Sequence, residues 1–113
     1  MNSRQRTLEA RIEKIKEKIV GMDELRPGSL SRQYNVCGTP GCRCKADPPQ
    51  KHGPYYQLSF TRKGKSSSQF VRREDLLRIK RQLRNYDRLR KLIDEWIDTS
   101  IELVRLSRDR EGQ

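Results

Sequence analysis

The stretch that decides the fold is VCGTPGCRCKADPPQKHGPYY, residues 36–56, because it contains all three cysteines of the chain and its only histidine. Cys37, Cys42, Cys44 and His52 are separated by four, one and seven residues. Three thiols and one imidazole form a donor set that zinc binds in structural sites, and tight turns commonly supply such ligands in local pairs. The glycines and the proline of CGTPGC suit a turn of this kind. The stretch therefore predicts a closed Cys3His site for a structural Zn²⁺ ion.

Other interpretations of the cluster remain open. Buried cysteines often act as small hydrophobic residues without a metal, one thiol could be a reactive redox group, and an iron–sulfur cluster with one histidine ligand is conceivable. Cys42 and Cys44 flank a single arginine in a stretch of Gly, Pro, Lys and Asp, which is not a core environment. Zinc is therefore the favoured interpretation.

Catalysis by this site is not expected. A catalytic zinc keeps an open coordination position and has a general acid or base nearby. The only carboxylate in the stretch is Asp47, and four protein ligands would leave no position for water. Paired carboxylates, a nucleophile with its base and a phosphate-cradling glycine loop are not recognisable elsewhere in the sequence. We therefore expect a protein that is not an enzyme and has no small-molecule substrate.

Helical periodicity flanks the cysteine-rich stretch on both sides. Residues 7–24 carry a short heptad seam that should end at the RPG of residues 26–28. Residues 73 to about 109 contain neither proline nor glycine, which predicts one long helix. Its apolar residues recur at Leu76, Ile79, Leu83, Tyr86, Leu89, Ile93, Trp96, Ile97, Ile101 and Val104. We expect the first helix to pack antiparallel along the C-terminal half of the second, with part of this stripe left for another copy.

Between the helices the pattern changes to that of strands. SLSRQYNV, PYYQLSF and SSSQFVR are short runs with strand character, and TRKGK between the last two predicts a hairpin turn. The expected fold is α+β: an N-terminal coiled-coil helix at 1–25, a zinc loop with a small antiparallel sheet at 26–72, and a long C-terminal helix at 73–113, together one compact domain. The helical arms predict a homodimer or a higher assembly.

Composition limits the classes of function. The chain has 113 residues, of which 32% are hydrophobic and 36% charged, so its core is small and needs a staple or a partner. The formal charge of +11 favours a polyanionic partner, with nucleic acid ahead of a membrane surface. No apolar run is long enough to span a bilayer, and the polar N-terminus does not resemble a signal peptide. We therefore expect a cytoplasmic protein, where thiols stay reduced.

The positive charge is concentrated in the middle of the chain. Residues 26–91 hold seventeen basic and four acidic side chains, whereas residues 92–113 hold three and six. A solvated helix face is the ordinary explanation of a charged run, but this imbalance favours contact with phosphates. The candidate nucleic-acid-binding residues are Arg62, Lys63, Lys65, Arg72, Arg73, Arg78, Arg81, Arg84, Arg88 and Lys91. DNA is favoured over RNA as the polymer.

Contacts to bases are less clearly indicated. Tyr55, Tyr56 and Phe60 could stack on unpaired bases if they faced outwards. A sheet this small needs at least one of its faces as core, so the sequence favours packing over stacking for these aromatic residues. Five polar residues could reach base edges, or equally could contact phosphates or be solvated turn residues: Ser66, Ser67, Ser68, Gln69 and Asn85.

The region LRPGSLSRQYNVCGTPGCRCKADPPQKHGPYYQLSFTRKGKSSSQFVR resembles an uncharacterised family of small basic proteins, a domain of unknown function. The shared features are Gly-Ser-Leu and a tyrosine before C-G-x-P-x-C-x-C, then H-G-P-Y-Y, a Gly-Lys turn and a long helix. The resemblance covers roughly residues 25–105 and supports Cys37, Cys42, Cys44 and His52 as one unit. It implies an association with bacterial and archaeal mobile elements, in which some members are labelled transposase-related.

Two functions follow as hypotheses. The first is a zinc-stabilised nucleic-acid-binding accessory protein, one of a mobile element. The alternative is a protein adaptor, in which the zinc loop and the helical arms bind a larger partner. Intrinsic binding of nucleic acid that weakens steeply with salt would distinguish the first from the second.

Overall fold

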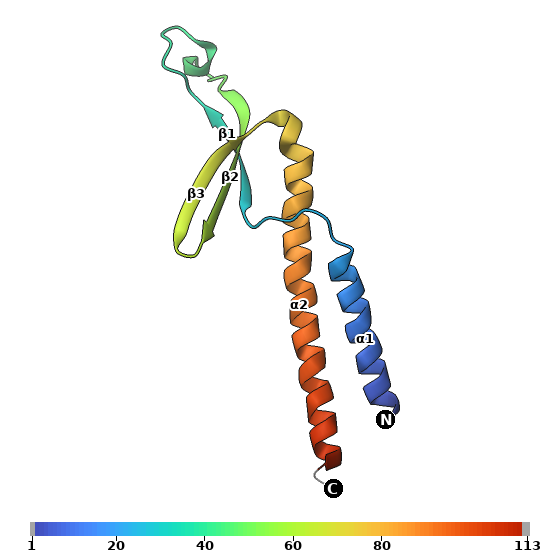
Figure 1. The fold of residues 1–113 in the computed structure, drawn as a ribbon. Helices are drawn as coiled ribbons and strands as arrows, with labels where there is room; N and C mark the ends of the chain where they lie inside the picture. The colour runs from blue at the N-terminus through green and yellow to red at the C-terminus, as the bar shows by residue number, and fades with distance from the viewer. Residues whose placement is uncertain (1, 112–113) are drawn as a thin grey trace. The chain divides into compact units, whose positions relative to one another are not determined.

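The chain folds into two long helices and one small sheet (Figure 1). The computed structural model describes residues 2–111, so the last two residues of the predicted C-terminal helix lie outside the described residues. The elements are α1 Ser3–Val20, β1 Ser29–Asn35, the 3-10 turn η1 Arg43–Lys45, β2 His52–Arg62, β3 Lys65–Val71, the 3-10 turn η2 Arg73–Asp75 and α2 Leu76–Glu111. The predicted α+β fold is confirmed.

Two compact units divide these elements. The helical unit contains Met1–Leu25 and Arg84–Gln113, and the sheet unit contains Arg26–Leu83. The first turns of α2 therefore belong to the sheet unit and the rest of α2 to the helical unit. Each unit is described separately below.

The ends of α1 differ from the predicted helix. Asn2 caps the N-terminus: its side chain accepts a hydrogen bond from the backbone N–H of Gln5 (2.7 Å), and the Gln5 side chain accepts one from the Asn2 N–H (3.1 Å). This reciprocal capping box starts the helix four residues before the first predicted position. At the other end the helix stops at Val20, and the N–H of Gly21 bonds back to the Glu17 carbonyl. The predicted end at Pro27 was wrong, because the chain leaves the helix at the glycine.

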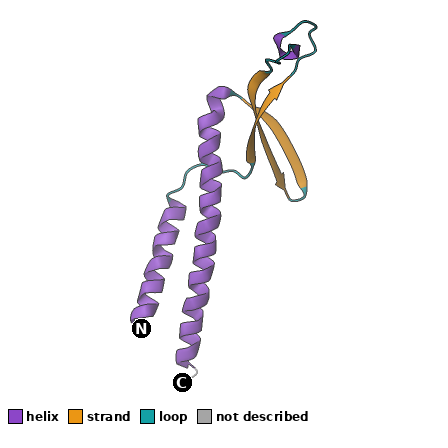
Figure 2. Cartoon of the chain, turned by 180° about the vertical axis from the view of Figure 1, so that it is seen from behind, coloured by secondary structure: helices purple, strands orange, loops and turns teal. Residues whose placement is uncertain are grey.

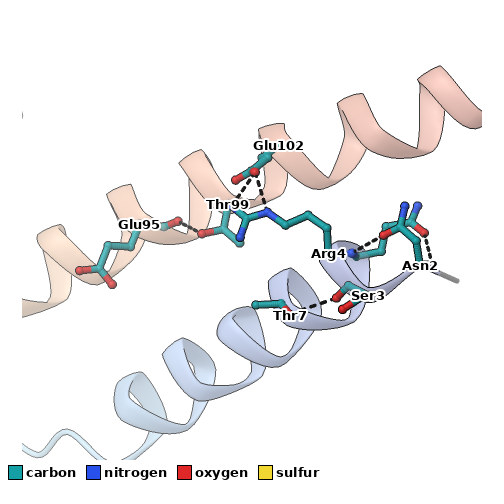
Figure 3. A network of polar contacts seen from close by, with 8 residues as sticks. Asn2, Ser3, Arg4, Thr7, Glu95, Thr99 and Glu102 are labelled. Atoms are coloured by element: carbon teal, nitrogen blue, oxygen red, sulfur yellow. Dashed lines mark hydrogen bonds and ion pairs between the residues drawn. The ribbon is translucent and has the colours of Figure 1, made fainter.

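In the helical unit, α1 packs antiparallel to α2, as predicted. Arg4, at the start of α1, bonds to Glu102 near the end of α2 (2.7 Å), whereas Asp23, three residues after the end of α1, accepts a hydrogen bond from Asn85 in the first half of α2 (2.8 Å). Figure 3 shows the Arg4–Glu102 ion pair, with the Thr99 hydroxyl donating to the Glu95 carbonyl one turn away (2.7 Å). Both partners of the ion pair are partly exposed, so it adds little stability. It mainly indicates which residues of the two helices lie side by side.

Apolar contacts hold the two helices together. Leu8, Ile12 and Ile15 of α1 are buried, and Leu92 and Thr99 are the buried positions on the facing part of α2. The seam on α2 continues at half-buried positions with heptad spacing, which are Asn85, Leu89, Trp96, Leu103 and Leu106.

A second set of apolar residues on α2 remains in water. It consists of Ile93, Ile97, Ile101 and Val104, which are 41–64% exposed and are called the exposed stripe below. The predicted apolar stripe is therefore divided between a buried seam and an exposed face.

In the sheet unit, the three strands pair antiparallel in the order β1-β2-β3. Ser29 lies opposite Ser59 in one ladder, and Arg62 lies opposite Lys65 in the other. The two-residue turn Lys63-Gly64 has positive φ at both positions (51° and 78°), as type I′ hairpins require. The predicted three strands and the predicted hairpin turn are confirmed.

One face of the sheet packs on the start of α2. Leu58, in the centre of β2, is completely buried. A Cβ atom on Gly28 would lie 3.0 Å from Leu58 and 3.5 Å from Leu83, so Leu58 and the second turn of α2 lie on either side of this glycine. The Arg26 N–H also donates to the Gln82 carbonyl (3.2 Å). This small core leaves the opposite sheet face in solvent.

Within the sheet unit, the cysteine-rich loop projects from one end of the sheet, where Figure 2 shows it with the short turn η1. Among the described residues 2–111, no helix combines the length and the apolar character needed to cross a membrane.

Candidate metal centre

The four predicted ligands come from three neighbouring segments of the sheet unit. Cys37 lies two residues after the end of β1, Cys42 and Cys44 flank the first residue of η1, and His52 is the first residue of β2. Asn35 pairs with His52 in the β1-β2 ladder, which closes the loop at its base. Strand pairing therefore brings the first and the last of the four residues together, although fourteen residues separate them in the sequence.

The distances between the donor atoms fit one metal ion. The Sγ atoms of Cys37 and Cys44 are 3.6 Å apart, and Cys42 Sγ is 3.1 Å from His52 Nε2. All four donor atoms lie within 4.8 Å of one another. Tetrahedral zinc with its usual bond lengths requires about 3.8 Å between two sulfurs and about 3.6 Å between sulfur and nitrogen. Cys37, Cys42, Cys44 and His52 thus lie close enough to hold a metal, as predicted.

Hydrogen bonds inside the loop fix its shape. The Cys42 N–H donates to the Thr39 carbonyl (3.4 Å), which closes the turn between the first two cysteines. The Gln50 N–H donates to the Arg43 carbonyl (2.9 Å), which ties the returning arm to η1. Gly41 adopts a φ of 77°, a conformation that favours glycine. Backbone hydrogen bonds therefore hold the loop both before Cys42 and after Cys44.

The thiols differ in their surroundings. Hydrogen bonds lower the pKa of the Cys37 thiol from 9.0 to about 6; the largest contribution comes from the Thr39 backbone N–H, followed by His52 and Cys42. Burial raises the pKa of the Cys44 thiol, which is only 1% exposed, although the Cys37 N–H donates to its sulfur (3.3 Å). N–H donors at these two sulfurs suit thiolates, the form in which cysteine binds a metal.

Gly53 is a residue of the centre that the donor pattern alone does not identify. Its φ is 137°, and a Cβ atom there would lie 2.8 Å from the Gln33 carbonyl oxygen. Only glycine fits between β1 and β2 at this point, directly after the histidine ligand. The sequence signal that could have identified it is the glycine of HGPYY, directly after the histidine.

The ten predicted nucleic-acid-binding residues are all exposed. Seven lie in the sheet unit: three at the β2-β3 hairpin, two between β3 and α2, and two in the first turns of α2. Arg84, Arg88 and Lys91 follow on α2 but belong to the helical unit. Arg72 lies 3.6 Å from Glu74, and both side chains are more than two-thirds exposed. The structure thus brings seven of the ten into one unit with the metal centre.

Comparison with known proteins identifies the family but no activity. The family model described as Domain of unknown function (DUF6788) matches residues 5–84. No curated protein and no solved structure matches the chain. The matched residues include most of α1, all three strands, the four donor residues and the start of α2. Because the match covers more than half of the chain, the protein belongs to the DUF6788 family of domains of unknown function.

Proposed function

We propose that the protein is a zinc-stabilised nucleic-acid-binding protein. The observation that carries this proposal is the division of charge between the two units. The sheet unit holds thirteen basic and three acidic residues, a net charge of +10, whereas the helical unit holds thirteen and twelve, a net charge of +1. Nearly all of the net positive charge is therefore on the unit that contains the four donor residues, because the basic residues of the helical unit are balanced by acidic ones. A polyanion such as nucleic acid is the partner that suits such a surface.

Zinc is the metal that we propose for the centre. Three thiolates and an imidazole are a common set of ligands for structural zinc, and the donor distances match a single tetrahedral ion. An iron–sulfur cluster has iron and sulfide atoms between its ligands, so its donors are further apart than these. A metal that cross-links the end of β1 to the start of β2 would stabilise a sheet whose core is small. With four protein ligands the role is structural, which supports a protein without catalytic activity.

Thiolate ligands also require a compartment in which cysteines stay reduced. This requirement supports the cytoplasm as the location of the protein.

The hairpin provides the most direct test of nucleic-acid binding. Lys63 and Lys65 are exposed and lie on either side of the turn glycine. If each neutralises one phosphate, the variant Lys63→Gln/Lys65→Gln should flatten the slope of log affinity against log salt by about 1.8 on duplex DNA and by about 1.4 on a single strand. Fluorescence anisotropy with labelled oligonucleotides at several salt concentrations measures this slope.

Arg11 and Lys14 form the matched control pair, because both are exposed on α1 in the nearly neutral helical unit. The variant Arg11→Gln/Lys14→Gln should bind with the parent slope. A parent protein that binds neither duplex nor single strand at low salt would refute the proposed function.

The exposed stripe favours a second function, assembly with another helix. We propose that a second copy of the chain covers it. Asp94, Asp98 and Arg105 each directly follow a residue of the stripe, and Arg108 lies one turn after Arg105. In an antiparallel pair of α2 helices centred near Ile101, the acidic residues of one copy face the arginines of the other. This arrangement predicts a homodimer. Sedimentation at several protein concentrations measures the mass in solution and tests it.

A constant monomer mass would contradict the homodimer. The adaptor function would then be favoured, with a helix of a larger partner protein on the stripe.

The association with a mobile element is also part of the proposal, and its support is the sequence resemblance alone. It predicts that genes for this chain lie beside genes for recombination enzymes more often than random genes of the same genomes do. A survey of gene neighbourhoods tests this.

A further inference from the structure

The solvent-facing side of the sheet has an unusual composition. Alternation along the three paired strands assigns ten residues to the side opposite Leu58, called the outer face. They are Ser29, Ser31, Gln33, Tyr55, Gln57, Ser59, Thr61, Ser66, Ser68 and Phe70. None of the ten is charged, although the sheet unit as a whole is strongly basic.

Hydroxyl and amide groups pair across this face. Ser59 lies 3.1 Å from Ser68, and Thr61 lies 3.0 Å from Ser66, each between side-chain oxygens. The Gln33 amide donates to the Gln57 side-chain oxygen (2.6 Å). A hydroxyl that makes one such bond still has a lone pair or a proton to offer. The outer face therefore carries a layer of uncharged polar groups that retains hydrogen-bonding capacity.

Two aromatic rings lie on this layer in contact with solvent. Phe70 is 68% exposed and Tyr55 is 43% exposed. Phe70 lies opposite Gln57, and Tyr55 precedes Gln57 by two residues on the same side of β2, so the two rings are diagonal neighbours. Diagonal positions on adjacent strands lie about 7–8 Å apart, within reach of aromatic side chains. An exposed phenylalanine beside a tyrosine marks a site where a ligand can cover apolar surface.

Basic residues lie at both ends of β3. Lys63 is in the hairpin turn, and Arg72 follows the strand directly, two residues after Phe70. Arg62 and Lys65, next to the turn, alternate to the Leu58 side. An uncharged surface with aromatic rings between two basic ends suits a single-stranded nucleic acid. Its bases can stack on the rings while its phosphates reach the basic residues. Duplex DNA offers phosphates outside and keeps its bases stacked inside, so it would leave the rings without a partner.

We infer that the outer face is a stacking platform for the unpaired bases of a single-stranded nucleic acid, with Phe70 and Tyr55 as the stacking residues. This inference rests on the proposed nucleic-acid binding and narrows its substrate class. Side-chain hydroxyls beside the rings would contact base edges or sugars, and the basic ends would hold the phosphates.

The test compares two strands that differ only in their bases. Binding of the full-length, zinc-loaded chain is measured by anisotropy at one salt concentration, with an oligothymidylate and with an abasic strand of the same length. The parent should bind the base-containing strand about tenfold more tightly, because stacking on an aromatic side chain contributes that much per base. Phe70→Ala should reduce this difference, because only Tyr55 then remains for stacking, and should leave affinity for the abasic strand unchanged.

Two further variants serve as controls. Phe70→Tyr keeps an aromatic ring and should bind like the parent. Leu77 is also an exposed apolar residue of the sheet unit, 81% exposed at the start of α2, so Leu77→Ala should change neither affinity. An oligouridylate distinguishes RNA from DNA, and the effect of Phe70→Ala should appear with whichever polymer binds.

The outcomes separate the two levels of the proposal. If the parent binds both strands equally, or if Phe70→Ala binds the base-containing strand as the parent does, the stacking platform is wrong while nucleic-acid binding through phosphates stands. If the parent binds no nucleic acid at all, the proposed function fails and the stacking platform fails with it.

Discussion

Gly53 places the histidine ligand of the metal centre. It follows His52 directly, at the point where β2 passes closest to the backbone of β1. Its positive φ and its contact with the Gln33 carbonyl would both be disturbed by a side chain. The position of the His52 imidazole therefore depends on how closely β1 and β2 approach each other at Gly53.

Gly53→Ala should lower the free energy of unfolding of the sheet unit by about 1–3 kcal/mol, the usual cost of a residue held in a disfavoured conformation. Gly38→Ala is the matched control, because a Cβ atom there meets nothing within 4 Å. Thermal unfolding of the zinc-loaded proteins measures both. Equal stability of the two variants would show that the strands can shift to accept the alanine.

Cys42→Ser should weaken zinc binding by more than about 100-fold, because loss of a ligand costs more than loss of a group that only orients one. Asp47→Asn serves as the control, since Asp47 lies in the same loop but outside the donor set. Competition with a zinc-binding dye gives both affinities. If Cys42→Ser binds zinc as tightly as the parent, Cys42 is not a ligand of the metal.

At the level of single residues, the donor set could be predicted and its geometry could not. Three cysteines and one histidine in a short stretch identify themselves by residue type. The strand pair that brings His52 back to Cys37 depends on a register set by contacts between residues far apart in the sequence. The exposure of Phe70 could not be predicted for the same reason. It lies on the side of the sheet opposite Leu58, and the sequence alone does not say which side is buried.

Among the elements, α2 shows why helical periodicity is not enough to assign a buried face. Its apolar residues extend over more than one side, so the sequence alone does not say which side meets α1. The buried seam includes Thr99, a polar residue whose hydroxyl donates to the Glu95 carbonyl of its own helix. Because that hydrogen bond satisfies the hydroxyl, the threonine can be buried, and isoleucines on the neighbouring side stay in water.

Ile97→Lys should abolish the proposed homodimer. Full burial of an isoleucine side chain contributes about 1.5–3 kcal/mol, and Ile97 is 50% exposed, so each copy would lose about half of this and the dissociation constant should rise by at least about tenfold. Analytical ultracentrifugation reads this change. Leu77→Lys is the control, because Leu77 is also an exposed apolar residue of α2 (81% exposed) but lies outside the stripe.

The charged residues beside the stripe test its orientation. Asp98→Arg and Arg105→Asp should each weaken the antiparallel dimer, and the double variant should recover it, because the opposite charges are then restored across the interface. A double variant as weak as either single one would argue against the antiparallel arrangement.

At the scale of the whole molecule, the two units differ in burial and in net charge. The helical unit has a buried apolar seam and almost no net charge, which suits assembly. The sheet unit has few buried residues, the four donor residues and nearly all of the net positive charge, which would suit the proposed binding. On so small a core, the proposed binding surface would gain stability from the cross-link that a metal supplies.

Amide hydrogen exchange of the full-length chain, read by mass spectrometry before and after zinc is removed by a chelator, tests this dependence most directly. In the zinc-loaded protein the amides of β2 and β3 should be protected. After chelation they should exchange rapidly, while α1 keeps its protection, because the four residues that would hold the metal lie between the end of β1 and the start of β2 and none of them is in α1. A zinc-free chain in which β2 and β3 remain as protected as before would contradict the structural role of the metal.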